Sequence, residues 1–541
     1  MHPKRTADEG LAERLARALA FAPTAGQARA IDAFERLLAT DRARATLILR
    51  GYAGTGKTTL VGALVKALRK QMPLVLLAPT GRAAKVLAAH AQQSASTIHR
   101  RIYRLSDEDM GWGGVSVAPN RDGGALFVVD EASMIGSNEQ SETDLLQDLL
   151  QHVFSAEGCK LLIVGDPAQL PPVGSDHSPA LSVKDLRAFG LAAGMIELTE
   201  VVRQAEASGI LRNATDLRAL LDTPSLPSPP SPAIAPSRRR ASPPSPASPP
   251  SPASPSSPPS PPSPSSPPSP PSPPSPSSPP SPPSPPSPPS PPSSLPLLPR
   301  FTPYRDVQRV DGHDLQDALE SAYGRYGDDE VCVICRSNKR AYQYNQQVRV
   351  RIHGYEEELT PGDRLMVVKN NYLWAGRNGK AELIANGEPM TVSRVHRVEE
   401  RYGLRFADIT ALWWNGVEER ELEVKVMLDT LAVESPALPS PRMKLLIQSV
   451  RAAFPVATKK ALFRIMREDP HANALQVKYA YAVTCHKAQG GQWREVFVDQ
   501  GYVTEEMIDR EYVRWLYTAV TRATERLNLL NFHARFWGDT D

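Results

Sequence analysis

The chain has 541 residues, a length that favours three or four domains. Its 62 basic and 59 acidic residues nearly cancel, which excludes a uniformly polycationic protein, so any surface for nucleic acid must come from local clusters of basic side chains. No apolar run reaches about 18 residues and no signal-peptide core is present, so we expect a soluble cytoplasmic protein without a membrane span.

The N-terminal part predicts two helices. Leucines at helical spacing indicate the first over residues 7–20, and the second runs from about Gln27 to Leu38 with Thr24 as its N-cap. The amide of Gln27 offers a donor and an acceptor, which suit the edge of an adenine. From the residues alone, a solvated glutamine at a helix start is the simpler interpretation.

A phosphate-binding loop follows the first strand. Gly51, Gly56, Lys57 and Thr58 match G-x-x-x-x-G-K-[ST] between an aliphatic strand and an apolar helix. The glycines let backbone N–H groups turn toward phosphate oxygens, and the helix N-terminus adds its positive dipole end. Lysine supplies a point charge for the β- and γ-phosphates and the Thr58 hydroxyl a ligand for Mg²⁺. We therefore expect ATP and Mg²⁺ as cofactors, with the nucleotide held by Gly51, Gly54, Thr55, Gly56, Lys57, Thr58 and Thr59.

A polar loop follows the second predicted strand, 74–78. The segment 79–85 contains Pro79, Thr80 and Arg82 and opens a helix, and Thr97 and His99 come soon after it. Ligands of open parallel sheets bind at the carboxyl ends of the strands. Hydroxyl and basic groups at such an end suit contacts with phosphodiesters.

Residues 103–124 interrupt the alternation of strands and helices. They are rich in glycine and are expected to form a small β-hairpin with Trp112 near its tip. Trp112 is equally compatible with an exposed aromatic wedge and with a side chain that packs on the domain surface.

Adjacent carboxylates end the strand at 125–129. Asp130 is placed to hold Mg²⁺ and Glu131 to polarise an attacking water, since both lie at the strand end that faces a phosphate loop. After a further strand at 160–166, Gln169 stands where a side-chain amide senses a γ-phosphate, and Arg203 closes the first half.

Residues 224–299 differ from the rest of the chain. Ser-Pro and Ser-Pro-Pro repeats dominate the segment, which holds 37 of the 54 prolines. Proline cannot continue a helix or a central strand, so we expect disorder and solvated polyproline II. A passive spacer is the favoured interpretation, and docking of a protein partner is the alternative.

Strands and helices return in the C-terminal half. Strand 331–335 carries Cys332 and Cys335, which face opposite ways and are interpreted as core thiols of a reducing compartment. A helix containing Asn345 follows it. Residues 361–440 alternate in polarity like a small antiparallel barrel, and residues 441–467 are expected to be helical.

The last segment, 480–530, again alternates strand and helix. A strand leads into a polar loop with Thr484, His486 and Lys487, and a later helix carries Arg522. Arg522 is the natural cation to reach a nucleotide held by the first half, where an arginine is worth roughly 10³–10⁵ in rate.

Together these segments resemble the superfamily 1 helicases, and within them the RecD/Dda-like branch. Nine stretches follow the order of that family's motifs, namely 51–58, 79–85, 97–99, 130–133, 165–173, 203–204, 336–339, 484–490 and 517–522. After the segment 484–490 the chain has Gly491-Gln492-Trp493, where many relatives carry an acid that binds ribose, so that role is not assigned to Gln492.

The resemblance implies an α/β fold: two RecA-like P-loop domains with parallel sheets, a small β-hairpin (1B) insertion and an SH3-like β-barrel (2B) insertion. The expected ranges are 1–222 for domain 1A with the hairpin at 103–124, 223–299 for the linker, 300–372 with 476–541 for domain 2A, and 373–475 for the barrel. The linker would then join the two motor halves.

By resemblance, the protein is an ATP-dependent DNA helicase that moves 5′ to 3′ on single-stranded DNA and opens forked DNA as a monomer. Lys57, Glu131, Gln169, Arg203 and Arg522 would be catalytic, Thr58 and Asp130 would hold the metal, and Gln27 would read adenine. DNA would lie along Pro79, Thr80, Arg82, Thr97, His99, Trp112, Asn338, Thr484, His486 and Lys487. The alternatives are a translocase that strips proteins from a strand without unwinding, and a scaffold that acts through its Pro/Ser tract.

Overall fold

The computed structural model describes residues 10–19, 21–105, 115–136, 144–202, 208–223, 299–374, 383–415, 417–455 and 458–537. Trp112, Arg203 and the Pro/Ser tract lie outside these ranges. Within them, no helix is both long and apolar enough to cross a bilayer.

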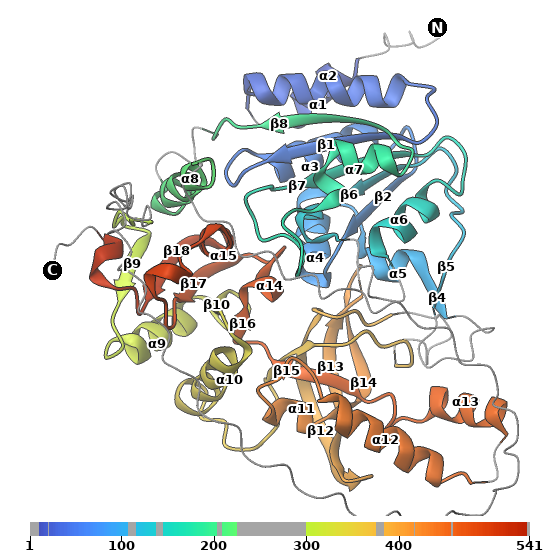
Figure 1. Ribbon diagram of the computed structural model, residues 1–541, viewed down its shortest axis with the longest axis vertical. Coiled ribbons are helices and arrows are strands. Elements are labelled where there is room, and N and C mark those ends of the chain that lie inside the picture. Colours follow the sequence, from blue (N-terminus) through green and yellow to red (C-terminus); the bar gives the residue numbers. More distant parts are fainter. Residues whose placement is uncertain are drawn as a thin grey trace, which may run out of the picture. The chain divides into compact units, whose positions relative to one another are not determined.

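The first domain is built on a parallel sheet, as expected (Figure 1). Its strand order is β3-β2-β6-β7-β1-β8, with bounds Ala95–Thr97, Leu74–Ala78, Leu126–Val129, Lys160–Gly165, Ala45–Gly51 and Ala192–Leu198. Aliphatic residues bury both faces of these strands, which is typical of a parallel sheet covered by helices. The helices are α1 (Leu11–Ala18), α2 (Ala25–Ala39), α3 (Lys57–Leu68), α4 (Gly81–Ala91), α5 (Ile98–Ile102), α6 (Leu145–Val153) and α7 (Val183–Ala188).

The two strands of the predicted hairpin insertion are present in the structure. β4 (Tyr103–Leu105) pairs with β5 (Val115–Val117) in an antiparallel two-stranded sheet. Thr24 is the N-cap of α2, as predicted, and forms a capping box with Gln27.

The second domain is a parallel sheet in the order β16-β10-β17-β18-β9. The strand bounds are Ala482–Thr484, Val331–Cys335, Trp493–Asp499, Ala523–Leu530 and Val307–Val310, and the helices are α9 (Leu315–Tyr326), α10 (Asn338–Gln347), α14 (Cys485–Ala488) and α15 (Arg510–Val520). Cys332 and Cys335 are buried in clusters on opposite faces of β10, which agrees with the predicted core thiols.

The barrel between the two parts of this domain is closed, with strands β11-β12-β13-β14-β15. Their bounds are Arg364–Val367, Pro389–Arg401, Leu404–Trp414, Glu419–Met427 and Leu475–Tyr479. The expected range 373–475 therefore lacks the first strand and most of the last, because β11 pairs with both β12 and β15. Closure also needs a parallel β14–β15 pair, whereas the alternating pattern indicated only antiparallel strands.

The predicted helix 441–467 is two helices, α12 (Ser440–Ala452) and α13 (Lys459–Glu468), which follow the short α11 (Asp429–Ala432). Thr458 caps the start of α13 with its side chain, so the chain begins a new helix instead of continuing the old one.

Helix α8 (Gly209–Leu221) packs with the second domain, although the expected boundary at 222 assigned it to the first. Its apolar side chains Ile210, Ala214, Leu217 and Leu221 join a cluster that includes Phe301, Val307 and the buried face of α15. Asp306 accepts hydrogen bonds from Ser208 and from the Gly209 backbone at the start of α8.

The two ends of the Pro/Ser tract therefore return to one domain. Asn213 of α8 donates to the Thr302 carbonyl at 3.0 Å and accepts from the Thr302 N–H at 2.8 Å. The segments on either side of the tract are thus hydrogen-bonded to each other. The expectation that the tract joins the two motor halves is wrong, since it begins and ends on the second domain.

A loop that leaves and rejoins one domain should be replaceable. We expect a Gly/Ser loop of about ten residues in place of 226–297 to raise the free energy of unfolding by roughly 2 kcal/mol, because each halving of loop length saves about 0.6 kcal/mol. Urea unfolding followed by far-UV circular dichroism measures this. A lower free energy of unfolding for the shortened chain would contradict the interpretation of the tract as a loop within one domain.

Candidate nucleotide and nucleic-acid site

The phosphate loop joins β1 to α3 in a conformation that requires glycine. Gly54 and Gly56 have φ values of 76° and 79°, in the left-handed region. A Cβ on Gly56 would lie 2.6 Å from the Gln27 amide nitrogen, and one on Gly51 would lie 2.8 Å from the Thr55 hydroxyl. The loop is therefore a tight backbone cradle at a helix N-terminus, which is the arrangement that binds phosphate groups.

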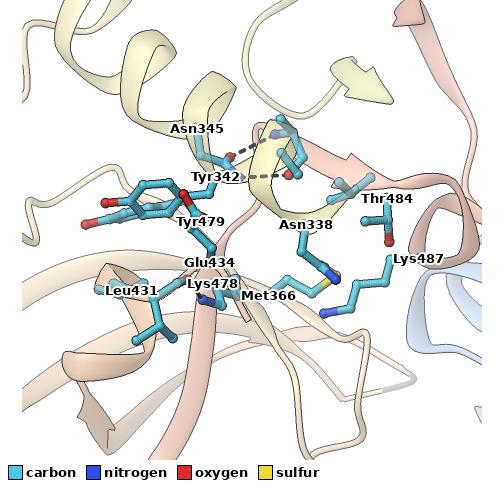
Figure 2. A pocket seen from close by; sticks show the side chains of 14 residues that line it. Asn338, Tyr342, Asn345, Met366, Leu431, Glu434, Lys478, Tyr479, Thr484 and Lys487 are labelled. Atoms are coloured by element: carbon cyan, nitrogen blue, oxygen red, sulfur yellow. Dashed lines mark hydrogen bonds between the residues drawn. The ribbon is translucent and has the colours of Figure 1, made fainter. Parts of the chain in front are cut away.

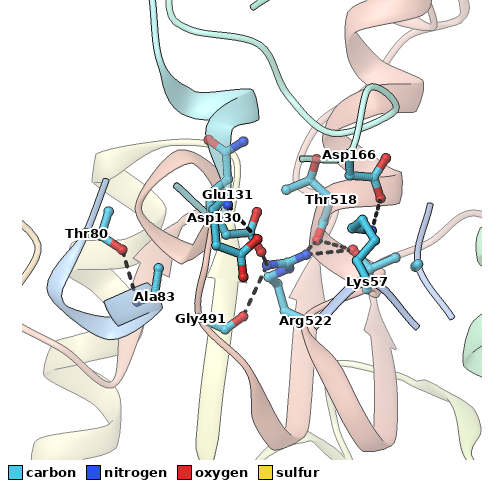
Figure 3. A network of polar contacts seen from close by, with 12 residues as sticks. Lys57, Thr80, Ala83, Asp130, Glu131, Asp166, Gly491, Thr518 and Arg522 are labelled. Carbon is cyan, nitrogen blue, oxygen red and sulfur yellow. Dashed lines mark hydrogen bonds and ion pairs between the residues drawn. The ribbon is translucent and has the colours of Figure 1, made fainter. Parts of the chain in front are cut away.

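Lys57 lies over this loop. Its ammonium donates to the carbonyls of Gly51 at 2.6 Å and Tyr52 at 2.9 Å, and lies 3.8 Å from an Asp166 carboxylate oxygen (Figure 3). Asp166 follows β7 and is 1% exposed. Burial raises the pKa of its carboxyl, and Lys57 and a hydrogen bond from Tyr517 oppose that shift. No role is predicted from the sequence for Asp166, which is the last residue of the expected strand 160–166.

Asp130 and Glu131 lie at the end of β6, as predicted. Burial and the neighbouring Glu131 carboxylate raise the pKa of Asp130 to about 7, while an N–H of Glu131 and the charge of Lys57 lower it. Glu131 has a φ of 54°, an uncommon conformation for a residue other than glycine. Two carboxylates close together in a buried setting fit a divalent cation, because a hard cation prefers such oxygens and offsets their repulsion.

Arg522 comes from the second domain and reaches this same place. It is 3% exposed, and its guanidinium lies 3.9 Å from a Glu131 carboxylate oxygen (Figure 3). The group is held by the Thr518 carbonyl at 3.1 Å and the Gly491 carbonyl at 3.2 Å. The structure therefore brings together the phosphate loop, the paired carboxylates and Arg522 from segments far apart in sequence.

Two further residues of α15 contact the first domain. The Tyr517 hydroxyl accepts from the Ala53 N–H of the phosphate loop at 2.8 Å and donates to Asp166 at 2.7 Å. The Thr518 hydroxyl accepts from the Leu170 N–H at 2.9 Å. No role is predicted for either side chain from the sequence. Both side chains lie in the last turn of α15, close in sequence to Arg522, and this closeness is the signal that would have found them.

The two candidate glutamines are buried. Gln27 is 0% exposed, its carbonyl accepts from the Thr24 N–H and its amide donates to the Thr55 carbonyl, so the interpretation as a solvated glutamine is wrong. Gln169 is 5% exposed, and its carbonyl oxygen has no hydrogen-bond partner among the described residues. Such a buried polar atom is costly unless something else satisfies it.

The residues expected along DNA follow strand ends on both domains. Thr80 and Thr97 cap α4 and α5 with their hydroxyls, after β2 and β3. On the second domain, Asn338, Thr484 and Lys487 line one small cavity of about 30 Å³ (Figure 2). Burial lowers the pKa of His99 and of His486, and lowers that of Lys487 to about 8. Pro79 directly precedes Thr80.

The Arg82 side chain contacts groups of the second domain. Its guanidinium donates to the carbonyls of Asp329 and Gln492 in the second domain and stacks on the Trp493 ring at 3.8 Å. Burial lowers the pKa of Arg82 to about 10. In this arrangement Arg82 joins the two domains, whereas the sequence analysis expected it to contact phosphodiesters.

Comparisons with known proteins agree with this geometry. The family model described as an AAA domain matches residues 23–220, and the one described as a UvrD-like helicase C-terminal domain matches residues 479–530. The first match covers the phosphate loop and the paired carboxylates, and the second covers the segment that ends with Arg522 and β18.

Two curated relatives are similar over part of their length. The ATP-dependent RecD2 DNA helicase of Deinococcus radiodurans is 34% identical over 172 residues, which are 32% of this chain and 21% of that protein. The ATP-dependent DNA helicase dda of Enterobacteria phage T4 is 29% identical over 204 residues, 36% of this chain and 42% of that protein. The chain thus spans less than half the length of either relative.

A crystal structure of a Bacteroides Pif1 helicase in complex with ADP-AlF3 and ssDNA aligns over 95% of this chain and 93% of that chain, with a TM-score of 0.41 and 14% identity. That likeness is too low to support an assignment. The ordered motifs, the shared site and the two family matches do support one. In its ordered motifs, its two family matches and its curated relatives, the chain is similar to the superfamily 1 helicases of the RecD/Dda-like branch.

Proposed function

We propose that this protein is an ATP-dependent DNA helicase, which moves on single-stranded DNA and separates the strands of a fork. One observation carries the proposal: Arg522 of the second domain lies 3.9 Å from Glu131, beside the phosphate loop of the first. The names of two relatives, both ATP-dependent DNA helicases, support it. The 5′-to-3′ direction, a monomeric state and a cytoplasmic location are further parts of the proposal.

ATP is held by the backbone of the loop from Gly51 to Thr59, with Lys57 on the β- and γ-phosphates. In this role Lys57 exchanges its carbonyl contacts for phosphate oxygens. Gln27 lies beside Gly56, where the loop enters α3, and is assigned to adenine. Thr58 and Asp130 hold Mg²⁺, which, when bound, neutralises charge on the phosphates.

Hydrolysis then uses groups from both domains. Glu131 orients and polarises the attacking water, and Gln169 offers its unpaired carbonyl oxygen at the same edge of the sheet. Arg522, with Arg203, stabilises the negative charge that develops on the γ-phosphate. Because Arg522 lies on the other domain, hydrolysis depends on how the two domains meet.

Motion of the domains is passed to DNA through residues at the strand ends. Tyr517 and Thr518 link α15 to the phosphate loop and to Leu170, so that helix responds to the nucleotide. The DNA contacts are assigned to Pro79, Thr80, Thr97 and His99 on the first domain and to Asn338, Thr484, His486 and Lys487 on the second. Alternating grips of these two sets move the strand. Docking of a protein partner on the Pro/Ser tract is a further part of the proposal.

We expect Lys57→Ala to abolish nucleotide binding and ATPase, and Glu131→Gln to bind ATP without turning it over. The first change removes the charge that pairs with the phosphates, and the second removes only the base-like carboxylate. Binding of a fluorescent ATP analogue and phosphate release, with and without an oligonucleotide, measure both. Rapid turnover by the Glu131→Gln variant would contradict the role of Glu131.

We expect Arg522→Ala to lower the DNA-stimulated ATPase by about 10³, with a much smaller loss of nucleotide affinity, because its charge acts mainly in the transition state. Arg494→Ala is the matched control, since Arg494 pairs with Glu525 on the surface of the same domain. Equal ATPase rates for the two variants would show that Arg522 has no catalytic part.

A forked duplex with a fluorescent pair separates a helicase from a translocase that strips proteins without unwinding. One duplex step is worth about 1.4 kcal/mol, comparable to a base–aromatic stack of about 1–3 kcal/mol, so an aromatic pin is sufficient to hold pairs apart. We expect Trp112→Ala to slow unwinding while single-strand translocation continues. If unwinding is as fast as before, Trp112 is no pin.

A further inference from the structure

Arg100, on α5 of the first domain, inserts into a socket on the barrel. Its guanidinium donates to the Leu383 carbonyl at 3.0 Å, the Asn415 carbonyl at 2.7 Å and a Glu388 carboxylate oxygen at 2.5 Å. We call Leu383, Glu388, Trp413 and Asn415 the Arg100 socket. Three acceptors in a fixed fork suit an arginine and not a lysine, which carries its charge at one point.

The Glu388 and Trp413 side chains of the Arg100 socket are buried and hydrogen-bonded to each other. Glu388 is 2% exposed, and its second carboxylate oxygen accepts from the Trp413 indole N–H at 2.7 Å. The Trp413 ring also lies 5.0 Å from the guanidinium carbon of Arg100. Each carboxylate oxygen therefore has its own donor, and the cation is in contact with an aromatic ring.

The same barrel turn packs against the loop after β2. A Cβ on Gly81 would lie 2.4 Å from the Glu388 side chain, so only glycine leaves room for this contact. A Cβ on Gly387 would lie 3.8 Å from Thr80. Hence the barrel contacts the first domain at Gly81 and Arg100, which are close in sequence to Thr80, Thr97 and His99, the residues to which DNA contacts are assigned.

The barrel borders the corresponding residues of the second domain as well. Lys478 and Tyr479 of β15 line the small cavity that also contains Asn338, Thr484 and Lys487 (Figure 2). Burial and the charge of Lys487 lower the pKa of Lys478 to about 8. The barrel thus lies next to the candidate DNA residues of both domains.

We propose that Arg100 fastens the barrel to the first domain, and that the fastened barrel forms one side of the path of single-stranded DNA and slows its release. The inference rests on the proposed function, which supplies the DNA. Arg100 is a positioning residue in this proposal and takes no part in ATP hydrolysis. Release of Arg100 lets the barrel, which is inserted in the second domain, move away from the loops of the first.

The electrostatics of the Arg100–Glu388 pair favour a role in positioning the barrel over a role in stabilising the fold. Burial raises the pKa of Glu388 to about 7, although Arg100 and the Trp413 N–H oppose the shift. The desolvation of the carboxylate thus outweighs the attraction within the pair, as is common for buried ion pairs. What the pair adds is one defined position of the barrel, because a different position would leave buried charges without partners.

The experiment compares Arg100→Ala, Glu388→Ala and the double variant with Arg101→Ala. Arg101 is the matched control, because it is the next residue of the same helix and pairs with Asp122 of its own domain. Amide hydrogen exchange of residues 383–388 without DNA reports the docking of the barrel. Release of a fluorescein-labelled oligo(dT) into excess unlabelled oligo(dT), by stopped flow, reports the hold on DNA. ATPase without DNA reports the catalytic site.

We expect Arg100→Ala and Glu388→Ala each to speed the exchange and to raise the oligonucleotide release rate by about tenfold, since each leaves the other charge unpaired in a buried site. The double variant should release DNA no faster than the worse single one, because the two side chains act as one unit. Arg101→Ala should match the wild type, and ATPase without DNA should change in none of them.

Faster exchange with an unchanged release rate would show that the contact is only structural and would overturn the inference. Additive effects of the two single variants would overturn it as well. If oligonucleotide does not stimulate phosphate release from ATP by the wild-type chain, the proposed function is overturned. The proposed path of single-stranded DNA beside the barrel is then overturned with it. The two failures are therefore distinguishable.

Discussion

The structure depends on a contact between groups that are far apart in the chain and close in space. Tyr517 accepts a hydrogen bond from Ala53 of the phosphate loop, 464 residues earlier, and donates one to the buried carboxylate of Asp166. Just after the same helix ends, Arg522 comes within 3.9 Å of Glu131. A site for a triphosphate needs several cations and N–H groups around one point, and here neither domain has all of them. Binding at this site is thereby tied to the meeting of the domains.

Buried carboxylates recur where the parts of the chain meet. Asp130, Asp166 and Glu388 all have a raised pKa because of burial, and each has a basic side chain nearby that opposes the shift. At Glu388 that cation comes from another domain. At Asp166, the group from the other domain is the Tyr517 hydroxyl, which donates a hydrogen bond to the carboxylate. A buried charge is tolerable only while its partner is in place, so these contacts favour a few defined arrangements over a continuum.

The two segments that flank the Pro/Ser tract pack on the same domain. The tract follows a helix that packs on the second domain and precedes the segment that hydrogen-bonds to that helix. The change of domain occurs earlier, between β8 and α8, so the length of the tract does not set the distance between the two motor halves. This arrangement accommodates a long insertion of unusual composition between two segments that pack on the same domain.

The elements that depend on near neighbours in the chain were predictable. The phosphate loop, the strand that delivers Asp130 and Glu131, the N-cap at Thr24 and the barrel region were all visible in the sequence. Their signals are local, because spacing, capping and alternation act over a few residues. The order of such signals was also sufficient to indicate the helicase family.

Other features were decided only by partners that come from distant segments. No local pattern indicates that Gln27 is buried, that Arg82 stacks on Trp493, that α8 packs on the second domain or that Arg100 enters the barrel. A basic side chain at a strand end looks the same in sequence whether it faces phosphate or a carbonyl of another domain. The sequence by itself determined the chemical groups and the family, and the tertiary structure decided which groups meet, because burial and pairing depend on packing between segments hundreds of residues apart.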